Sequence, residues 1–106
     1  MADKIRCVSK RPGGSPRSVN VTNSLENLQN YVGGYIETLT IAEDLCILIC
    51  NEEGRIKGLP YNCTVCGVEL YGDILFVGVD GDAFSDLPCT FAEFKAVFRD
   101  LWEEGE

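Results

Sequence analysis

Two cysteines with two residues between them, Cys63 and Cys66, form the pattern in this chain that is best suited to chemistry. Two thiolates at this spacing in a turn can bind one Zn²⁺ ion. A closed tetrahedral site needs four ligands, and the chain has no histidine to supply the others. We therefore expect no metal site and no cofactor, and keep zinc bound by Cys63 and Cys66 as a weak alternative.

Several residue types that usually mark an enzyme are missing from the sequence. Without histidine the commonest general base is lacking, and the chain contains neither a Gly-x-x-x-x-Gly-Lys phosphate loop nor a Gly-x-Ser-x-Gly elbow. We therefore expect no catalytic residues and a binding protein that is not an enzyme.

Aromatic and amide side chains near backbone breakers are the better candidates for ligand contact. Tyr35 follows Gly34 and Tyr61 follows Pro60, and aromatic side chains offer a large contact area for little lost entropy. The alternative is that these tyrosines cap the edge of a sheet. A basic loop over residues 10–17 could meet a small anion. The candidate ligand-binding residues are Arg11, Arg17, Tyr35, Glu37, Asn51, Tyr61 and Asn62.

The net charge of −8 is unevenly distributed along the chain. Residues 1–22 hold five basic residues and one acidic residue, whereas the remainder holds four basic and sixteen acidic residues. Affinity for duplex DNA depends on a basic surface that releases counterions, so we expect no direct duplex binding. The acidic remainder could instead attract a basic protein surface.

The strands that must position these residues follow from the hydrophobic pattern. Residues 45–50 and 74–79 are apolar on both faces, which is typical of central strands. The polar residues 51–54 suit a hairpin loop, after which residues 55–59 should return as a partner strand. The expected strands cover residues 4–8, 18–21, 35–41, 45–50, 55–59 and 74–79.

Two helices complete the expected fold. Asn23 can cap the first, which should end at Gly33 and Gly34. Thr90 and Glu93 form a capping box before an apolar stripe that reaches Trp102. The order of elements predicts a single α+β domain over residues 1–106: a small antiparallel or mixed sheet with two helices, the C-terminal helix packed on one sheet face.

The sequence also resembles a known family in three segments. These are residues 25–37, which include Val32-Gly33-Gly34-Tyr35, residues 50–62, which include Leu59-Pro60-Tyr61-Asn62, and residues 72–78. They resemble the small phage and conjugative-element proteins grouped as domain-of-unknown-function family 3846. The resemblance implies an origin in a mobile element and carries no established activity. The cysteine pair is not part of its pattern.

Accessory proteins of mobile elements often act stoichiometrically on host systems, so we expect a counter-defence binder. In one hypothesis it sequesters a small anionic, nucleotide-like ligand in a pocket between protomers. In the alternative it is an acidic inhibitor or DNA mimic that blocks a host nucleic-acid enzyme, in particular a host defence protein. A continuous carboxylate ridge would favour that alternative, and it would comprise Asp80, Asp82, Asp86, Glu103 and Glu104.

Location and assembly can also be anticipated. The first ten residues contain no apolar segment after their charges, and no apolar run approaches the ~18 residues of a membrane helix. We expect a cytoplasmic protein without membrane contact, in the host cytosol if a phage encodes it. The apolar last helix and the two apolar strands offer more hydrophobic surface than two short helices can cover, which predicts a homo-oligomer, a dimer or larger.

Overall fold

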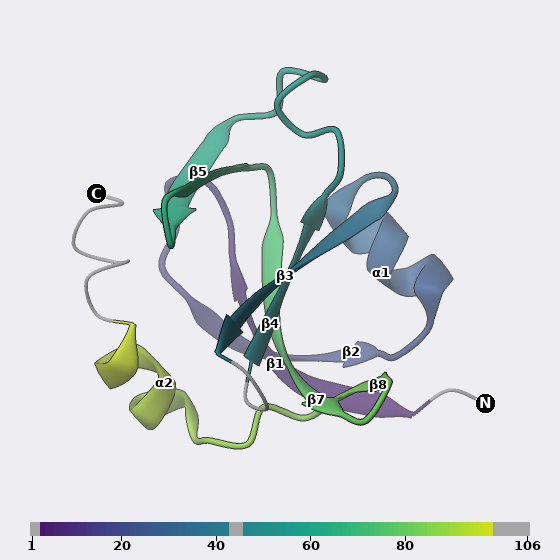
Figure 1. The fold of residues 1–106 in the computed structure, drawn as a ribbon, viewed down its shortest axis with the longest axis vertical. Coiled ribbons are helices and arrows are strands. Elements are labelled where there is room, and N and C mark those ends of the chain that lie inside the picture. Colours follow the sequence, from purple (N-terminus) through teal and green to yellow (C-terminus); the bar gives the residue numbers. More distant parts are fainter. Residues whose placement is uncertain (1–2, 43–45, 99–106) are drawn as a thin grey trace.

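A six-stranded antiparallel sheet lies at the centre of the computed structural model, which describes residues 3–42 and 46–98 (Figure 1). Five strands lie side by side in the order β2-β1-β7-β4-β3, and β8 pairs with β7. A separate two-stranded sheet joins β5 and β6. The strands are β1 (Lys4–Lys10), β2 (Arg17–Thr22), β3 (Ile36–Ala42), β4 (Cys46–Asn51), β5 (Tyr61–Val65), β6 (Val68–Tyr71), β7 (Ile74–Asp80) and β8 (Ala83–Ser85).

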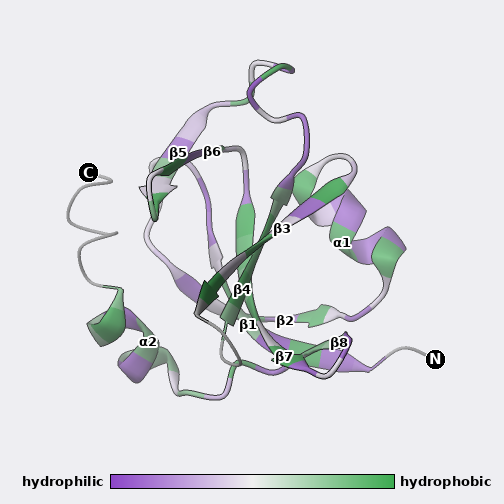
Figure 2. Ribbon diagram, viewed as in Figure 1, coloured by the Kyte–Doolittle hydropathy of each residue, from purple (hydrophilic) through white to green (hydrophobic). Residues whose placement is uncertain are grey.

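Each face of the main sheet packs on its own hydrophobic cluster. On one face, α1 (Leu25–Val32) places Leu28 and Val32 on side chains of β1, β4 and β7. On the other face, the β5–β6 hairpin and α2 (Phe91–Val97) cover the sheet. Figure 2 shows hydrophobic colouring on β4 and β7, and both strands contribute side chains to the two clusters. This arrangement explains why their sequences are apolar on both faces.

The strand register aligns the side chains of the face covered by α2. Val8, Leu48 and Leu39 lie in one row with Phe76, because Phe76 pairs with both Val8 and Leu48, and Leu48 pairs with Leu39. The ring of Phe94 in α2 meets the ring of Phe76 edge to face, with centroids 5.0 Å apart. This contact fixes the C-terminal helix on one face of the sheet.

Local capping sets the limits of both helices. Ser24 caps α1, one residue later than expected, because its side chain accepts from the Asn27 amide, whereas the Asn23 side chain donates to the Phe84 carbonyl. Gly33, with φ of 82°, ends the helix as predicted. The capping box of Thr90 and Glu93 is also confirmed, and its hydrogen bonds to Thr90 lower the pKa of the Glu93 carboxyl.

The α+β class, the antiparallel pairing and the packing of the C-terminal helix agree with the sequence prediction. The predicted strand over residues 55–59 is wrong, because that segment forms turns. Strands β5, β6 and β8 were not anticipated. The end of the predicted last helix, including Trp102, lies outside the described residues.

Candidate functional site

The loop between β4 and β5 is one capped helical turn that projects from the sheet (Figure 1). The Asn51 side chain accepts from the Glu53 amide at 2.7 Å, and the Lys57 amide donates to the Glu53 carbonyl at 2.8 Å. Gly58, with φ of +73°, closes the turn, because its amide donates to Arg55 and the next amide donates to Gly54. A turn that ends at a left-handed glycine therefore stands where the sequence predicts a return strand.

Asn51 also connects this loop to α1. Its Nδ2 donates to the Val32 carbonyl at 3.0 Å, and the residue is buried. Its side-chain oxygen is used by Glu53, so both ends of the amide bind within the protein. The geometry therefore gives Asn51 the role of holding the loop against the end of α1.

Asn62 forms a second internal junction. Its Nδ2 donates to the Lys10 and Gly72 carbonyls, each at 2.8 Å, and its Oδ1 accepts from the Lys10 ammonium at 3.0 Å. Asn62 and Lys10 are each 2% exposed. No carboxylate lies within ion-pair distance of Lys10 among the described residues, so this buried cation is held by a neutral amide. Asn62 therefore holds Lys10, at the end of β1, together with Gly72, which lies between β6 and β7.

Two hollows flank Gly33 at the C-terminal end of α1, and we call them together the Gly33 groove. The first measures about 450 Å³ and the second about 420 Å³. The first is lined by Gln29, Asn30, Gly33, Gly34, Tyr35 and Lys57. The second is lined by Arg11, Pro12, Tyr31, Val32, Gly33, Leu59, Pro60, Gly72 and Asp73. Residues from all three family-like segments therefore meet in the groove.

Gly34 lets a cation approach the backbone in the first hollow. A Cβ at this position would lie 3.0 Å from both the Lys57 Nζ and the Asn51 Nδ2, closer than ordinary van der Waals contact. Lys57 also faces the Glu53 carboxylate at 3.8 Å. Residue 34 must therefore stay small for the ammonium to keep its place beside Tyr35.

The groove combines two cations with exposed acceptors. Gly33 and Gly34 both donate their amides to the Gln29 carbonyl, at 2.9 and 3.0 Å. Among the described residues, no backbone amide beyond the helix donates to the Asn30 or Tyr31 carbonyl. Helix C-terminal carbonyls attract donors and positive charge. Lys57 lines the first hollow at this helix end, and Arg11 lines the second together with Asp73. The groove can therefore contact anionic groups and hydrogen-bond donors of one ligand.

The structure distributes the seven sequence candidates over several places. Arg11 and Tyr35 line the Gly33 groove, and Tyr35 is 68% exposed. Tyr61 lies on β5, where its hydroxyl bonds to the Thr64 hydroxyl at 2.6 Å. Glu37 lines a smaller hollow of about 140 Å³ beside β6. Arg17 is exposed at the start of β2, and Asn51 and Asn62 are buried.

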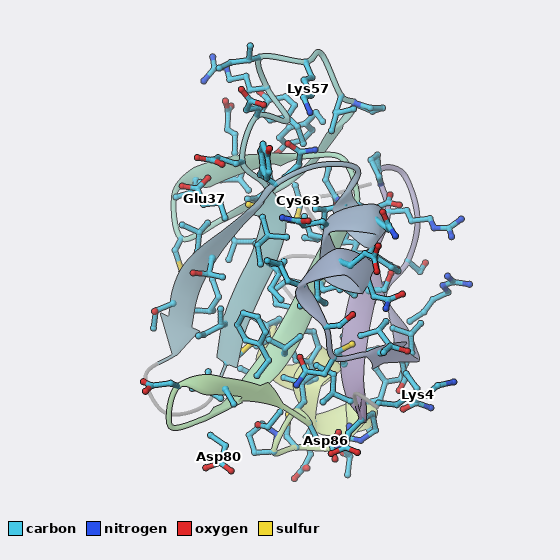
Figure 3. All side chains as sticks on the ribbon, turned by 90° about the vertical axis from the view of Figure 1, so that its right-hand side faces the viewer. Lys4, Glu37, Lys57, Cys63, Asp80 and Asp86 are labelled. Carbon is cyan, nitrogen blue, oxygen red and sulfur yellow. The ribbon has the colours of Figure 1, made fainter. Side chains whose placement is uncertain are left out.

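Lys57 is the groove residue that the sequence interpretation missed. The sequence predicts a return strand over residues 55–59, and an alternating strand pattern does not indicate that Lys57 reaches a site shared with α1. Figure 3 shows Lys57 on the projecting loop, at the opposite end of the molecule from Asp80 and Asp86. The Gly54-to-Gly58 spacing, which suits a capped helical turn, was the available signal.

The two cysteines of the zinc alternative lie in different environments. Cys63 faces the hydrophobic core and is 2% exposed, whereas Cys66 is exposed at the β5–β6 turn. Burial raises the pKa of Cys63 from 9.0 to about 11, which favours the neutral thiol. Within residues 3–42 and 46–98, no group of three or more histidine, cysteine or acidic side chains is placed to hold a metal ion. The geometry offers the zinc alternative no support.

The acidic residues of the mimicry hypothesis cluster only in part. Asp80 and Asp82 are exposed at the turn between β7 and β8. Asp86 lies nearby in sequence, and its carboxylate accepts from the Arg6 amide at 2.7 Å. Glu103 and Glu104 lie outside the described residues.

Comparison with known protein families gives a match over most of the chain. The model of the family described as Domain of unknown function (DUF3846) matches residues 5–99. No curated protein and no solved structure is significantly similar to the chain. Among the described residues, no helix has the length and apolar character needed to span a membrane.

Proposed function

The chain belongs to the DUF3846 family, and from that premise we propose that it is a non-catalytic mobile-element protein that sequesters a small anionic, nucleotide-like ligand in counter-defence. The observation that carries the proposal is the Gly33 groove, where Lys57 lines the first hollow with Tyr35 and Arg11 lines the second, in an otherwise acidic chain. The family-like segments converge there, as a shared binding site would require.

The chemistry of the groove fits the parts of a nucleotide. The ring of Tyr35 is exposed enough to stack on a base. The Asn30 and Tyr31 carbonyls, to which no backbone amide beyond the helix donates in the described part of the chain, can accept from exocyclic amino groups, and the two cations can bind phosphate oxygens. Gly33 has no side chain and leaves the backbone accessible, so a flat ligand can lie close to the end of α1.

Native mass spectrometry of the full chain, purified from cells with active phage-defence signalling, tests the proposal directly. We expect a non-covalent adduct of nucleotide mass. The bare protein in repeated preparations, with no binding of nucleoside monophosphates or cyclic dinucleotides in titrations, contradicts it.

Variants of the groove then locate the site. Lys57→Ala and Arg11→Ala should each weaken the affinity for the retained nucleotide about tenfold or more, because each removes a charge-assisted hydrogen bond worth about 1.5–3 kcal/mol. Arg55→Ala is the matched control, because it removes a cation from the same loop that does not line the groove. Equal losses in all three variants indicate general electrostatic attraction and exclude the groove as the site.

The exposed pair Asp80 and Asp82 favours a second candidate, an acidic inhibitor of a host nucleic-acid enzyme. Their turn lies at the end of the molecule away from the Lys57 loop (Figure 3), so the two functions would use different surfaces. In this case Asp80→Asn with Asp82→Asn should abolish competition with DNA for the enzyme and leave nucleotide retention unchanged. Inhibition that survives both substitutions contradicts this candidate.

A further inference from the structure

The edge strand β3 carries a row of backbone groups that has no strand partner among the described residues. It stands at the end of the strand order and, within residues 3–42 and 46–98, pairs with β4 alone. The Glu52 amide donates to the Tyr35 carbonyl at 2.9 Å, which makes these two residues a hydrogen-bonded pair. Such pairs alternate along antiparallel strands. The backbone groups of Glu37 and Leu39 therefore point to β4, and those of Ile36, Thr38 and Thr40 point outward.

The two edges of the main sheet differ in how they discourage association. Natural edges are protected by proline, positive charge or irregular geometry. β2 follows Pro16 and begins with the exposed Arg17. β3 contains no proline and no basic residue, and its register stays regular from Ile36 to Thr40 before a shift between Thr40 and Ala42. The β3 edge is therefore open over the length of a regular ladder.

We propose that β3 pairs antiparallel with β3 of a second copy of this chain, centred on Thr38. The outward groups of Ile36, Thr38 and Thr40 are symmetric about Thr38, so a two-fold axis there satisfies all three residues. Thr38 then faces Thr38 of the second copy, and Ile36 faces its Thr40, each pair exchanging two backbone hydrogen bonds. The result is one sheet continuous across two protomers.

The side chains fit this register. Threonine pairs across strands are favourable, and Thr38 is exposed. Glu37, the one ionisable residue of β3, faces Leu39 of the second copy and not another Glu37, so no like charges stand directly opposite. A strand of another protein would need the same complementarity by chance, whereas a second copy has it by symmetry.

Charge substitutions at the two-fold axis test the interface with the full chain. Thr38→Lys and Thr38→Glu each place like charges opposite one another, and an equimolar mixture of the two variants restores an attractive pair. By sedimentation velocity we expect the unmodified protein to be a dimer. The dimer dissociation constant should be about tenfold higher for each variant alone than for the mixture, and mixing the two variants should restore the dimer.

Matched substitutions on the other edge provide the control. By the same alternation, the Asn20 backbone points away from β1, so Asn20→Lys and Asn20→Glu make the same charge changes on β2. These variants should keep the dimer. A monomeric mass for the unmodified protein at tens of micromolar overturns the proposal, as does a dimer that Thr38 variants leave unchanged or that Asn20 variants weaken equally.

The backbone itself supplies a second test. Thr38→Pro removes one outward amide and leaves the hydrogen bonds of Glu37 and Leu39 to β4 in place. Its urea midpoint shows whether the variant folds, and the folded variant should be monomeric. Retention of the dimer by folded Thr38→Pro overturns the proposed pairing.

Discussion

Asn62→Ala should destabilise the protein more than any other single change of a polar side chain described above. Asn62 makes three hydrogen bonds while 2% exposed. Alanine removes two amide–carbonyl bonds, each worth about 1 kcal/mol, and leaves a buried ammonium unpaired at about 2–3 kcal/mol. We expect a loss of about 4–5 kcal/mol, a large part of the ~5–15 kcal/mol typical of such a domain.

Urea denaturation followed by tryptophan fluorescence and circular dichroism measures this loss. Asn20→Ala removes an exposed asparagine from β2 and should change the unfolding free energy by less than about 0.5 kcal/mol. Lys10→Met removes the buried charge, so the double variant should lose less than the sum of the two single losses. A loss below about 1 kcal/mol for Asn62→Ala, or additive losses in the cycle, refutes the junction as described.

Two further predictions concern the cysteines. Cys66 adopts φ of 51° before Gly67, so Cys66→Asn should stabilise the protein by about 0.5–1 kcal/mol in the same urea assay, and a lower midpoint contradicts this. Burial raises the thiol pKa from 9.0 to about 11 in Cys7, Cys50 and Cys63, and to about 12 in Cys46. Unfolded thiols release protons above pH 9.0 that folded thiols keep, so the unfolding free energy should fall as pH rises through that range, by up to about 1.4 kcal/mol per pH unit for each thiol. Cys46→Ala should reduce this slope, and an unchanged slope contradicts the assignment.

The elements that the sequence predicted are those with a local signal. Strands β4 and β7 are apolar on both faces, and the Thr90 capping box is complete within four residues. The loop after β4 was misassigned because a distant contact, Asn51 to the Val32 carbonyl, holds its helical turn in place. Hairpin β5–β6 has a weaker local signal, because Cys66 adopts a φ of 51° at its turn, a conformation that cysteine seldom takes.

The candidate site was harder to anticipate for the same reason. Asn62 meets Lys10 across 52 positions of sequence, and no spacing rule connects them. Lys57 reaches the groove because Gly34 has no side chain to exclude it. Arg11 and Tyr35 were found because a basic loop and an exposed aromatic residue beside a glycine are recognisable in sequence.

The place of β1 in the sheet has a consequence for synthesis of the protein. β1 comes first among the described strands, but its inner neighbour β7 follows five other strands, and the Arg6 guanidinium donates to the Leu87 and Cys89 carbonyls. Such non-local pairing slows folding, because distant segments must lose chain entropy by meeting before any stabilising contacts form between them. The sheet therefore cannot close on the ribosome until β7 has been synthesised, because β7 is the strand that joins the β1–β2 pair to the β3–β4 pair.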